Sequence, residues 1–333
     1  MMVKAGYTLY RFDMSIQNIL ITADAAGMRA DRFIRQQFPG VTQGWIEKAI
    51  RKGEVRANNR KLKAAGDRLV EGQILTLPPL PELDAPAPQL PPAVNPKLAK
   101  TIIAAVIAET PEYIALNKPA GIASQGGSKI VWSIDRLATA LVPDGEDTPK
   151  LVHRLDKDTS GLMLLAKTTA AARKLGDAFK SREMRKCYLA ITEGVPKNPT
   201  GRFVQRLMKK PTPHGGEMVQ VDLKGQSAVT DYIVLDTLGK KYALVALWPR
   251  TGRTHQLRVH LAHHGTPIVG DYKYGNGVPE DKLPDRLYLH ALRLSWPDLK
   301  KPLVAPPDAE FVEAQGILGL NFPPTQDPFA GLD

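Results

Sequence analysis

Short apolar runs separated by polar turns mark the chain from residue 113 onward. Each run is shorter than a typical helix, so a buried strand is the better interpretation. The predicted strands are residues 113–116, 162–166, 186–191 and 242–247. A basic, glycine-rich stretch at 208–225 is predicted to form a hairpin with a long loop.

Helical segments lie between these strands. Residues 133–141 are predicted to be helical, and Thr168 or Thr169 can cap another helix that has Leu175 and Phe179 on one face. Strands and helices follow one another without the regular alternation of a doubly wound α/β protein. The pattern therefore favours an α+β fold.

The N-terminal part of the chain, residues 17–78, has the pattern of a small separate domain. It contains a predicted helix at 30–38 and a second helix between a capping Thr42 and Gly53. A hairpin follows, with its turn at Asn58-Asn59, because asparagine tolerates the positive φ of tight hairpin turns. The domain is thus a compact helix-hairpin unit.

A proline-rich stretch separates this unit from the rest. Residues 78–96 contain eight of the 28 prolines, which favour an extended, semi-rigid spacer. The predicted organisation is a first domain at 17–78, a linker at 79–99, a second domain at 100–322 and a poorly ordered tail at 323–333.

The charge balance points to a polyanionic partner. The chain has 45 Lys and Arg against 34 Asp and Glu, a net charge of +11, which suits nucleic acid. The single cysteine, Cys187, excludes an intramolecular disulfide and a multi-cysteine metal site. No run reaches the length of a membrane span, and residues 1–11 lack a signal-peptide core, so we expect a cytoplasmic protein, with an organellar presequence left open.

One charged turn stands out against this background. The run His153-Arg154-Leu155-Asp156-Lys157-Asp158-Thr159-Ser160-Gly161 lies between two apolar pieces that are predicted to be buried. Unpaired charge is costly to place beside a core, so the turn is a candidate site. Asp158 is interpreted as a capping or turn residue and Asp156 as the candidate for chemistry.

This run resembles the catalytic motif of the RluA-type pseudouridine synthases, in which the aspartate is essential. Four further blocks occur in that family's order. They are Asn117-Lys118-Pro119-x-Gly121, Lys186-x-Tyr188-x-Ala190, the run from Arg250 through Arg258 to Tyr274, and Leu289-His290-Ala291. The loop Gln125-Gly126-Gly127-Ser128 and the N-terminal domain bring the chain closest to the RluC-like ribosomal large subunit branch.

The resemblance implies that Asp156 is the nucleophile on a flipped-out uridine, most simply in 23S ribosomal RNA. It assigns to Arg258 the guanidinium that keeps the carboxylate ionised, with Arg253 as the alternative, and we expect Arg258 to hold Asp156 bidentately. It assigns to Tyr188 the ring that stacks on the base, with assistance in the deprotonation of carbon 5 left open. Arg154, Lys118 and Arg253 are expected to position the loop or bind RNA. Isomerisation needs no cofactor, and whether Asp156 attacks the sugar or first removes its 2′ proton stays open.

The implied fold is a mixed, largely antiparallel sheet in the second domain. The first domain resembles the S-four RNA-binding domain through Arg29-x-Asp31-x-Phe33 and Lys52-Gly53-Glu54-Val55-x-Ala57-Asn58. Its basic side chains are expected to follow RNA phosphates. They are Arg51, Lys52, Arg56, Arg60 and Lys61. We expect a monomer that binds RNA and no membrane.

Four alternatives are less well supported by the sequence. A serine hydrolase is disfavoured because Thr159-Ser160-Gly161 lacks the Gly-x-Ser-x-Gly frame, and a glycosidase because Asp156 and Asp158 are too close in sequence. His260 and His264 are one helical turn apart, but no further metal-ligand block follows, so we predict no metal site. A non-catalytic RNA-binding protein is disfavoured because Asp156, Tyr188 and Arg258 are all present. The sequence does not say which uridines are modified.

Overall fold

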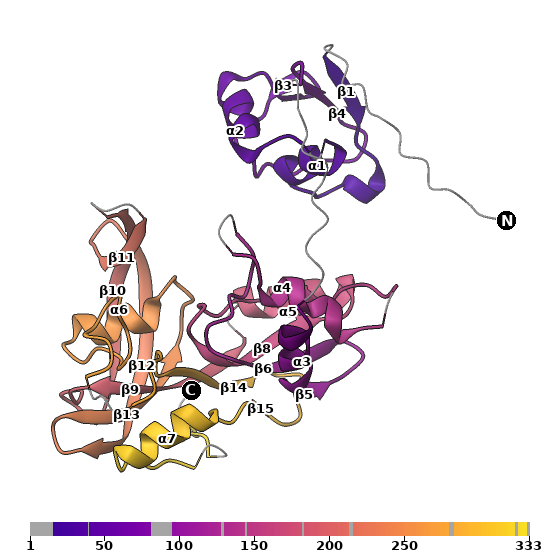
Figure 1. Cartoon of the computed structure of the whole chain (residues 1–333). Helices are drawn as coiled ribbons and strands as arrows, with labels where there is room; N and C mark the ends of the chain where they lie inside the picture. Colours follow the sequence, from indigo (N-terminus) through magenta and orange to yellow (C-terminus); the bar gives the residue numbers. More distant parts are fainter. Residues whose placement is uncertain are drawn as a thin grey trace. The chain divides into compact units, whose positions relative to one another are not determined.

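The computed structural model describes residues 16–331 apart from 39, 81–94, 128–129, 144, 182, 213–215, 280–282 and 324–325. The chain divides into two compact units, residues 1–92 and 93–333 (Figure 1). Within the described residues, no helix is both long and apolar enough to cross a membrane. Most of the predicted linker lies outside those residues, but α3 begins at Pro96, so residues 96–99 are helical and not extended as predicted.

The first unit is a four-stranded antiparallel sheet with two helices. Its strands, in the order β1-β4-β2-β3, are β1 Gln17–Leu20, β4 Ile74–Leu77, β2 Arg56–Ala57 and β3 Arg60–Lys61. The helical elements are the short η1 Ala23–Ala25, α1 Ala30–Gln37 and α2 Gln43–Lys52. Thr42 caps α2 by accepting from the Trp45 N–H, and Gly53 ends it with a φ of 73°, both as predicted. Asn58 and Asn59 have φ values of 47° and 62°, which confirms the tight hairpin turn.

The second unit is built on one 11-stranded sheet in the order β11-β10-β12-β13-β9-β14-β8-β6-β5, with β15 beside β14 and β7 beside β8. The strands are β5 Val106–Glu109, β6 Tyr113–Lys118, β7 Lys150–Leu151, β8 Ser160–Ala166, β9 Arg185–Glu193, β10 Thr200–Pro211, β11 Glu217–Val221, β12 Gln226–Leu238, β13 Tyr242–Pro249, β14 Leu289–Ser295 and β15 Leu303–Val304. All four predicted strands are present, and β10 and β11 form the predicted hairpin. Among these strands only β14 and β8 pair in parallel, so the sheet is mixed and largely antiparallel, as expected.

Strand β14 joins two half-sheets. It pairs with β9 on one side and with β8 on the other, so Ala291 is opposite Tyr188 and also opposite Gly161. Gly161 has a φ of 107°, and a Cβ placed there would lie 2.3 Å from the Ala291 carbonyl oxygen. Only glycine fits this junction, because both the backbone conformation and the space exclude a side chain.

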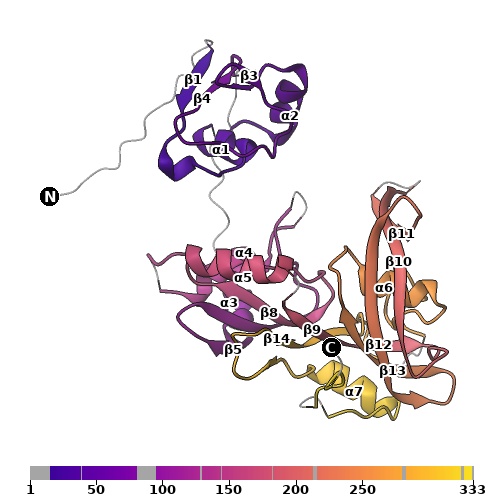
Figure 2. The same ribbon diagram turned by 180° about the vertical axis from the view of Figure 1, so that it is seen from behind.

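Helices lie beside both halves of the sheet (Figures 1 and 2). On one half are α3 Pro96–Ala104, α4 Ile134–Leu137 with the short η2 Ala138–Leu141, and α5 Thr169–Ser181. On the other half are α6 Gln256–His263 and α7 Ala309–Ile317. Thr168 caps α5, as predicted, by accepting from the Ala171 N–H. Each half has its own apolar core, and the partly buried ring of Tyr188 packs against both.

The C-terminal tail is more ordered than the sequence suggested. Phe329 is 1% exposed, and its ring centroid lies 5.6 Å from that of Trp248. Arg185 donates a hydrogen bond to the Phe329 carbonyl oxygen. The prediction of a poorly ordered tail is therefore wrong for residues 326–331, since one aromatic side chain is sufficient to fix a short segment against the sheet.

Candidate active site

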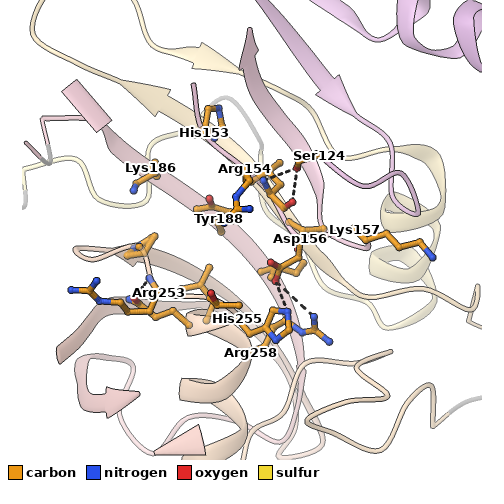
Figure 3. A pocket seen from close by; sticks show the side chains of 18 of the residues that line it. Ser124, His153, Arg154, Asp156, Lys157, Lys186, Tyr188, Arg253, His255 and Arg258 are labelled. Carbon is orange, nitrogen blue, oxygen red and sulfur yellow. Dashed lines mark hydrogen bonds and ion pairs between the residues drawn. The ribbon is translucent and has the colours of Figure 1, made fainter. Parts of the chain in front are cut away.

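A cavity of about 630 Å³ opens in the second unit, and Asp156 lies in its wall (Figure 3). Four segments line it: the loop after β6, the turn between β7 and β8, strand β9, and the loop that leads from β13 into α6. Asp156 is the one carboxylate among the described lining residues. Six cationic side chains line the same cavity: Arg154, Lys157, Lys186, Lys209, Arg253 and Arg258.

The Asp156 turn is held by its neighbours through backbone groups. The hydroxyl of Ser124 donates to the Leu155 carbonyl at 2.5 Å and accepts from the Leu155 N–H at 3.0 Å. The Thr159 N–H donates to the Asp156 carbonyl at 3.2 Å. The Asp156 side chain itself is 30% exposed and faces the cavity. The carboxylate is thus accessible while its backbone is fixed.

Lys118 positions the same turn, which is the first of the two roles expected of it, and its burial leaves no room for the second, a contact with RNA. Its side chain is fully buried at the end of β6, and Nζ donates to the carbonyls of Pro119, Ile122 and Lys157 at 2.8, 2.8 and 3.0 Å. Burial lowers the pKa of Lys118 to about 7, against the opposing charges of Asp158 and Asp156. A buried ammonium with three acceptors has no donor left for a phosphate.

His153 is a structural residue. Its ring stacks on Phe179 at a centroid distance of 4.3 Å, and Nε2 accepts from the Leu164 N–H at 2.9 Å. Burial, followed by the charge of Lys186, lowers the pKa of His153 to about 3, so the imidazole is neutral at physiological pH. It fixes the start of the charged turn against β8.

Arg258 faces Asp156, but its fork binds another carboxylate. Nε and Nη2 donate to Asp271 at 2.7 Å each, whereas Nη1 lies 3.7 Å from Asp156 Oδ2. The expectation of a bidentate Arg258–Asp156 pair is therefore wrong. Burial lowers the pKa of Arg258, but the hydrogen bonds and charge of Asp271, together with Asp156, outweigh it and raise the pKa. Arg258 supplies a fixed positive charge near Asp156.

Tyr188 reaches the cavity from β9. Burial, and then the charge of Asp156, raises the pKa of the Tyr188 hydroxyl well above its ordinary value, so the phenol stays protonated. A protonated phenol is a poor base. The raised pKa gives no support to Tyr188 as a base, and its stacking on the uracil stays a prediction.

The loop before α6 contains a site residue that the sequence reasoning missed. The residue before α6 is His255, with a φ of 52° and no side-chain cap, although Thr254 is the residue type that favours this position. His255 Nε2 lies 3.9 Å from Asp156 Oδ2, and Nδ1 lies 2.7 Å from the Tyr274 hydroxyl. Its place inside the motif, between Arg253 and Arg258, is the sequence signal that could have identified it.

The other histidines of this segment have structural partners. His260 is fully buried and bonds Thr230 Oγ1 through Nδ1 at 3.0 Å. His264 bonds Gln205 at 2.9 Å and stacks on Phe203. Within the described residues, no three His, Cys, Asp or Glu side chains form a group that could hold a metal ion.

The remaining predicted RNA contacts fall in two places. Arg154 and Arg253 line the cavity, with Arg253 Nε also donating to the Ser227 carbonyl at 3.1 Å. In the first unit, Arg51, Lys52 and Lys61 line a hollow of about 510 Å³. Arg56 and Arg60 are exposed on the adjoining hairpin. These contacts stay predictions.

Comparison with known proteins identifies the class to which this fold and site belong. Residues 112–263 match the RNA pseudouridylate synthase family. The chain is 40% identical over 272 residues to the Ribosomal large subunit pseudouridine synthase C of Rickettsia bellii (strain RML369-C), an alignment that covers 79% of this chain and 87% of that protein. The chain therefore belongs to the RNA pseudouridylate synthases, which are isomerases.

Its relatives support the RluC-like branch that the motifs suggested. It is 36% identical over 293 residues to the protein of the same name from Escherichia coli (strain K12), covering 85% of this chain and 89% of that one. Among solved structures it is similar to Human RNA Pseudouridylate Synthase Domain Containing 4. That match has a TM-score of 0.58 at 31% identity, over 68% of this chain and 97% of the other.

Proposed function

We propose that this protein isomerises uridines to pseudouridine in large-subunit ribosomal RNA, in the cytoplasm and as a monomer, with Asp156 as the catalytic carboxylate. One observation supports this above the others: a single accessible carboxylate lies in a cavity whose other charged side chains are all cationic. Cationic walls attract a polynucleotide, and the carboxylate can react with the sugar of a base turned into the cavity. The names of the relatives suggest the class of RNA.

The reaction breaks the bond between N1 of uracil and C1′ of ribose and forms a bond from C5 to C1′. The base turns between the two steps, and the proton lost from C5 is balanced by one gained at N1, so no redox change occurs and no cofactor is needed. Asp156 acts on the sugar, either by attack at C1′ or by removal of the 2′ proton. Arg258 keeps the carboxylate ionised, and Tyr188 stacks on the base.

The test is pseudouridine mapping of large-subunit RNA from cells with and without this gene, by carbodiimide treatment and primer extension. We expect specific stops that vanish without the gene. They should return with the wild-type gene but not with the Asp156→Asn variant. Asp158→Asn is the matched control, because it removes the same charge two residues away on an exposed side chain and should restore the stops.

Other outcomes would redirect the assignment. Restoration of the stops by Asp156→Asn would exclude Asp156 as the catalytic carboxylate. If the wild-type protein binds RNA but forms no pseudouridine, the protein is an RNA-binding protein that has the fold of the enzyme without its activity. Stops confined to transfer RNA would keep the reaction and change the substrate.

A further inference from the structure

His255 has an unusual backbone conformation beside Asp156, and the mechanism above does not use it. It is one of three non-glycine residues with positive φ in the described chain, and the other two form the hairpin turn at Asn58-Asn59. A side chain held in this conformation inside a cavity wall is a strained arrangement of the kind found at functional sites. The His255 side chain is 20% exposed, and Nε2 is the atom that points at Asp156, 3.9 Å from Oδ2.

The neighbours of Tyr274 determine which imidazole nitrogen carries the proton. The Tyr274 hydroxyl accepts from the Val219 N–H at 3.1 Å and lies 2.7 Å from His255 Nδ1. We assign the phenolic hydroxyl as the donor to Nδ1, because this arrangement leaves an N–H on the side of the ring that faces Asp156. The imidazole proton is then on Nε2. The opposite tautomer would turn the Nε2 lone pair toward the carboxylate of Asp156, which is repulsive.

One short turn orients both groups that face Asp156. Asp271 Oδ1 accepts from the N–H groups of Lys273 and Tyr274 at 2.9 and 3.0 Å, which fixes the turn. The Asp271 carboxylate holds the Arg258 guanidinium, whose Cζ lies 5.2 Å from the centre of the Tyr274 ring. Residues 271–274 therefore set the direction of Arg258 through Asp271 and of His255 through Tyr274.

Burial favours the neutral form of the His255 imidazole. Burial lowers the pKa of His255, and Arg258 and Lys273 lower it further, whereas the carboxylates of Asp156 and Asp271 act in the opposite direction. A neutral imidazole has a single N–H, so its direction matters. That single donor faces the carboxylate on which the proposed reaction depends.

We propose that His255 is a positioning residue for Asp156: as the neutral Nε2–H tautomer, fixed by Tyr274, it donates to the carboxylate and, with Arg258, sets its orientation toward the ribose. A movement of about 1 Å brings the two atoms to hydrogen-bond distance. This rests on the proposed role of Asp156. His255 and Arg258 then hold the carboxylate from one side, and its other face is left to the substrate.

The first test needs no RNA. The full-length protein, labelled with ¹⁵N at its seven histidines, is titrated by NMR, and His255 is assigned by the signal lost in His255→Gln. We expect the Nε2–H tautomer in the wild type and a mixture of tautomers in Tyr274→Phe. Asp156→Asn should lower the pKa of His255 further, because it removes the charge that opposes the shift. An Nδ1–H tautomer in the wild type, or a pKa unmoved by Asp156→Asn, would overturn the proposal.

The second test measures single-turnover rates at saturating RNA. His255→Leu removes the donor and should slow the reaction about 10- to 100-fold with RNA affinity unchanged, the effect of losing a hydrogen bond to a charged group. His255→Gln keeps an N–H donor and should recover most of the rate. His263→Gln, an exposed histidine of α6, is the control and should match the wild type. A wild-type rate for His255→Leu would refute the positioning role.

The two tests separate this inference from the proposed function. If the NMR results hold but no RNA is modified, the interaction between His255 and Asp156 is supported and the proposed function fails. If RNA is modified in a manner that depends on Asp156 but not on His255, the proposed function stands and the positioning role fails.

Discussion

Replacing Asp271 with asparagine removes the charge that holds the Arg258 guanidinium and keeps a side chain of nearly the same shape. The pair is buried, with side-chain exposures of 9% for Arg258 and 1% for Asp271, and it is joined by two hydrogen bonds of 2.7 Å. Removing one partner of a buried pair typically costs about 3–5 kcal/mol. The asparagine oxygen can still accept one hydrogen bond, and Arg258 can turn toward Asp156. We therefore expect Asp271→Asn to lower the free energy of unfolding by about 3 kcal/mol, the lower end of that range.

The pH dependence gives a second signature of the same pair. Burial raises the pKa of Asp271, but the hydrogen bonds from Arg258 outweigh it and hold the pKa below its ordinary value of 3.8. A carboxyl with a depressed folded-state pKa contributes stability that is present above its unfolded pKa and lost as pH falls through the folded one. The difference between wild type and Asp271→Asn should therefore be constant from about pH 5 to 8 and narrow below about pH 4.

Urea unfolding of the full-length protein, monitored by tryptophan fluorescence, measures the free energy of unfolding of the wild type and of Asp271→Asn. Three of the four tryptophans, Trp132, Trp248 and Trp296, lie in the second unit and report on it. A double-mutant cycle with Arg258→Met isolates the pair: the double variant should be less destabilised than the sum of the two single variants. A loss of less than about 1 kcal/mol in the free energy of unfolding for Asp271→Asn, or no coupling in the cycle, would show that Asp271 does not hold Arg258 tightly.

Three more substitutions test other parts of the structure. Lys118→Met should cost about 2–4 kcal/mol in urea unfolding and raise hydrogen exchange in residues 154–159, because three carbonyls lose their donor; unchanged exchange there would show that Lys118 does not hold the turn. Gly161→Ala should give a protein that is insoluble or unfolds at much lower urea, whereas Gly176→Ala on α5, which has open space, should not destabilise; equal behaviour would contradict the close β8–β14 junction. Arg51→Gln with Lys61→Gln should weaken RNA binding and reduce its salt slope without changing the rate at saturating RNA, and a normal slope would exclude these side chains as phosphate contacts.

Local pattern predicted much of the fold and the centre of the site. The four strands predicted from apolar runs are present, and the caps at Thr42 and Thr168 have the hydrogen bonds that their residue types favour. Asp156 could be identified because a charged turn between two buried pieces needs an explanation beyond packing. In these cases the physical cause lies within a few neighbouring residues.

The partners of the site residues could not be predicted in the same manner. Whether the fork of Arg258 meets Asp156 or Asp271 depends on how two distant loops approach each other, and both carboxylates were present in the motifs. The sequence left open whether Lys118 positions the loop or binds RNA, and only its three carbonyl partners in the structure show that it is buried in the first role. The motif contains His255, but its direction toward Asp156 depends on a positive φ that only the folded loop shows.

The insertion of β14 between the half-sheets has a consequence for how the enzyme is made. A growing chain that ends before residue 289 already contains Asp156 and Tyr188, but it lacks the strand that sets β8 and β9 on either side of Ala291. The two half-sheets would each leave an open edge at that stage, and the site would not exist. We therefore expect a nascent or prematurely terminated chain to be inactive toward RNA, so that catalysis begins only when synthesis is nearly complete.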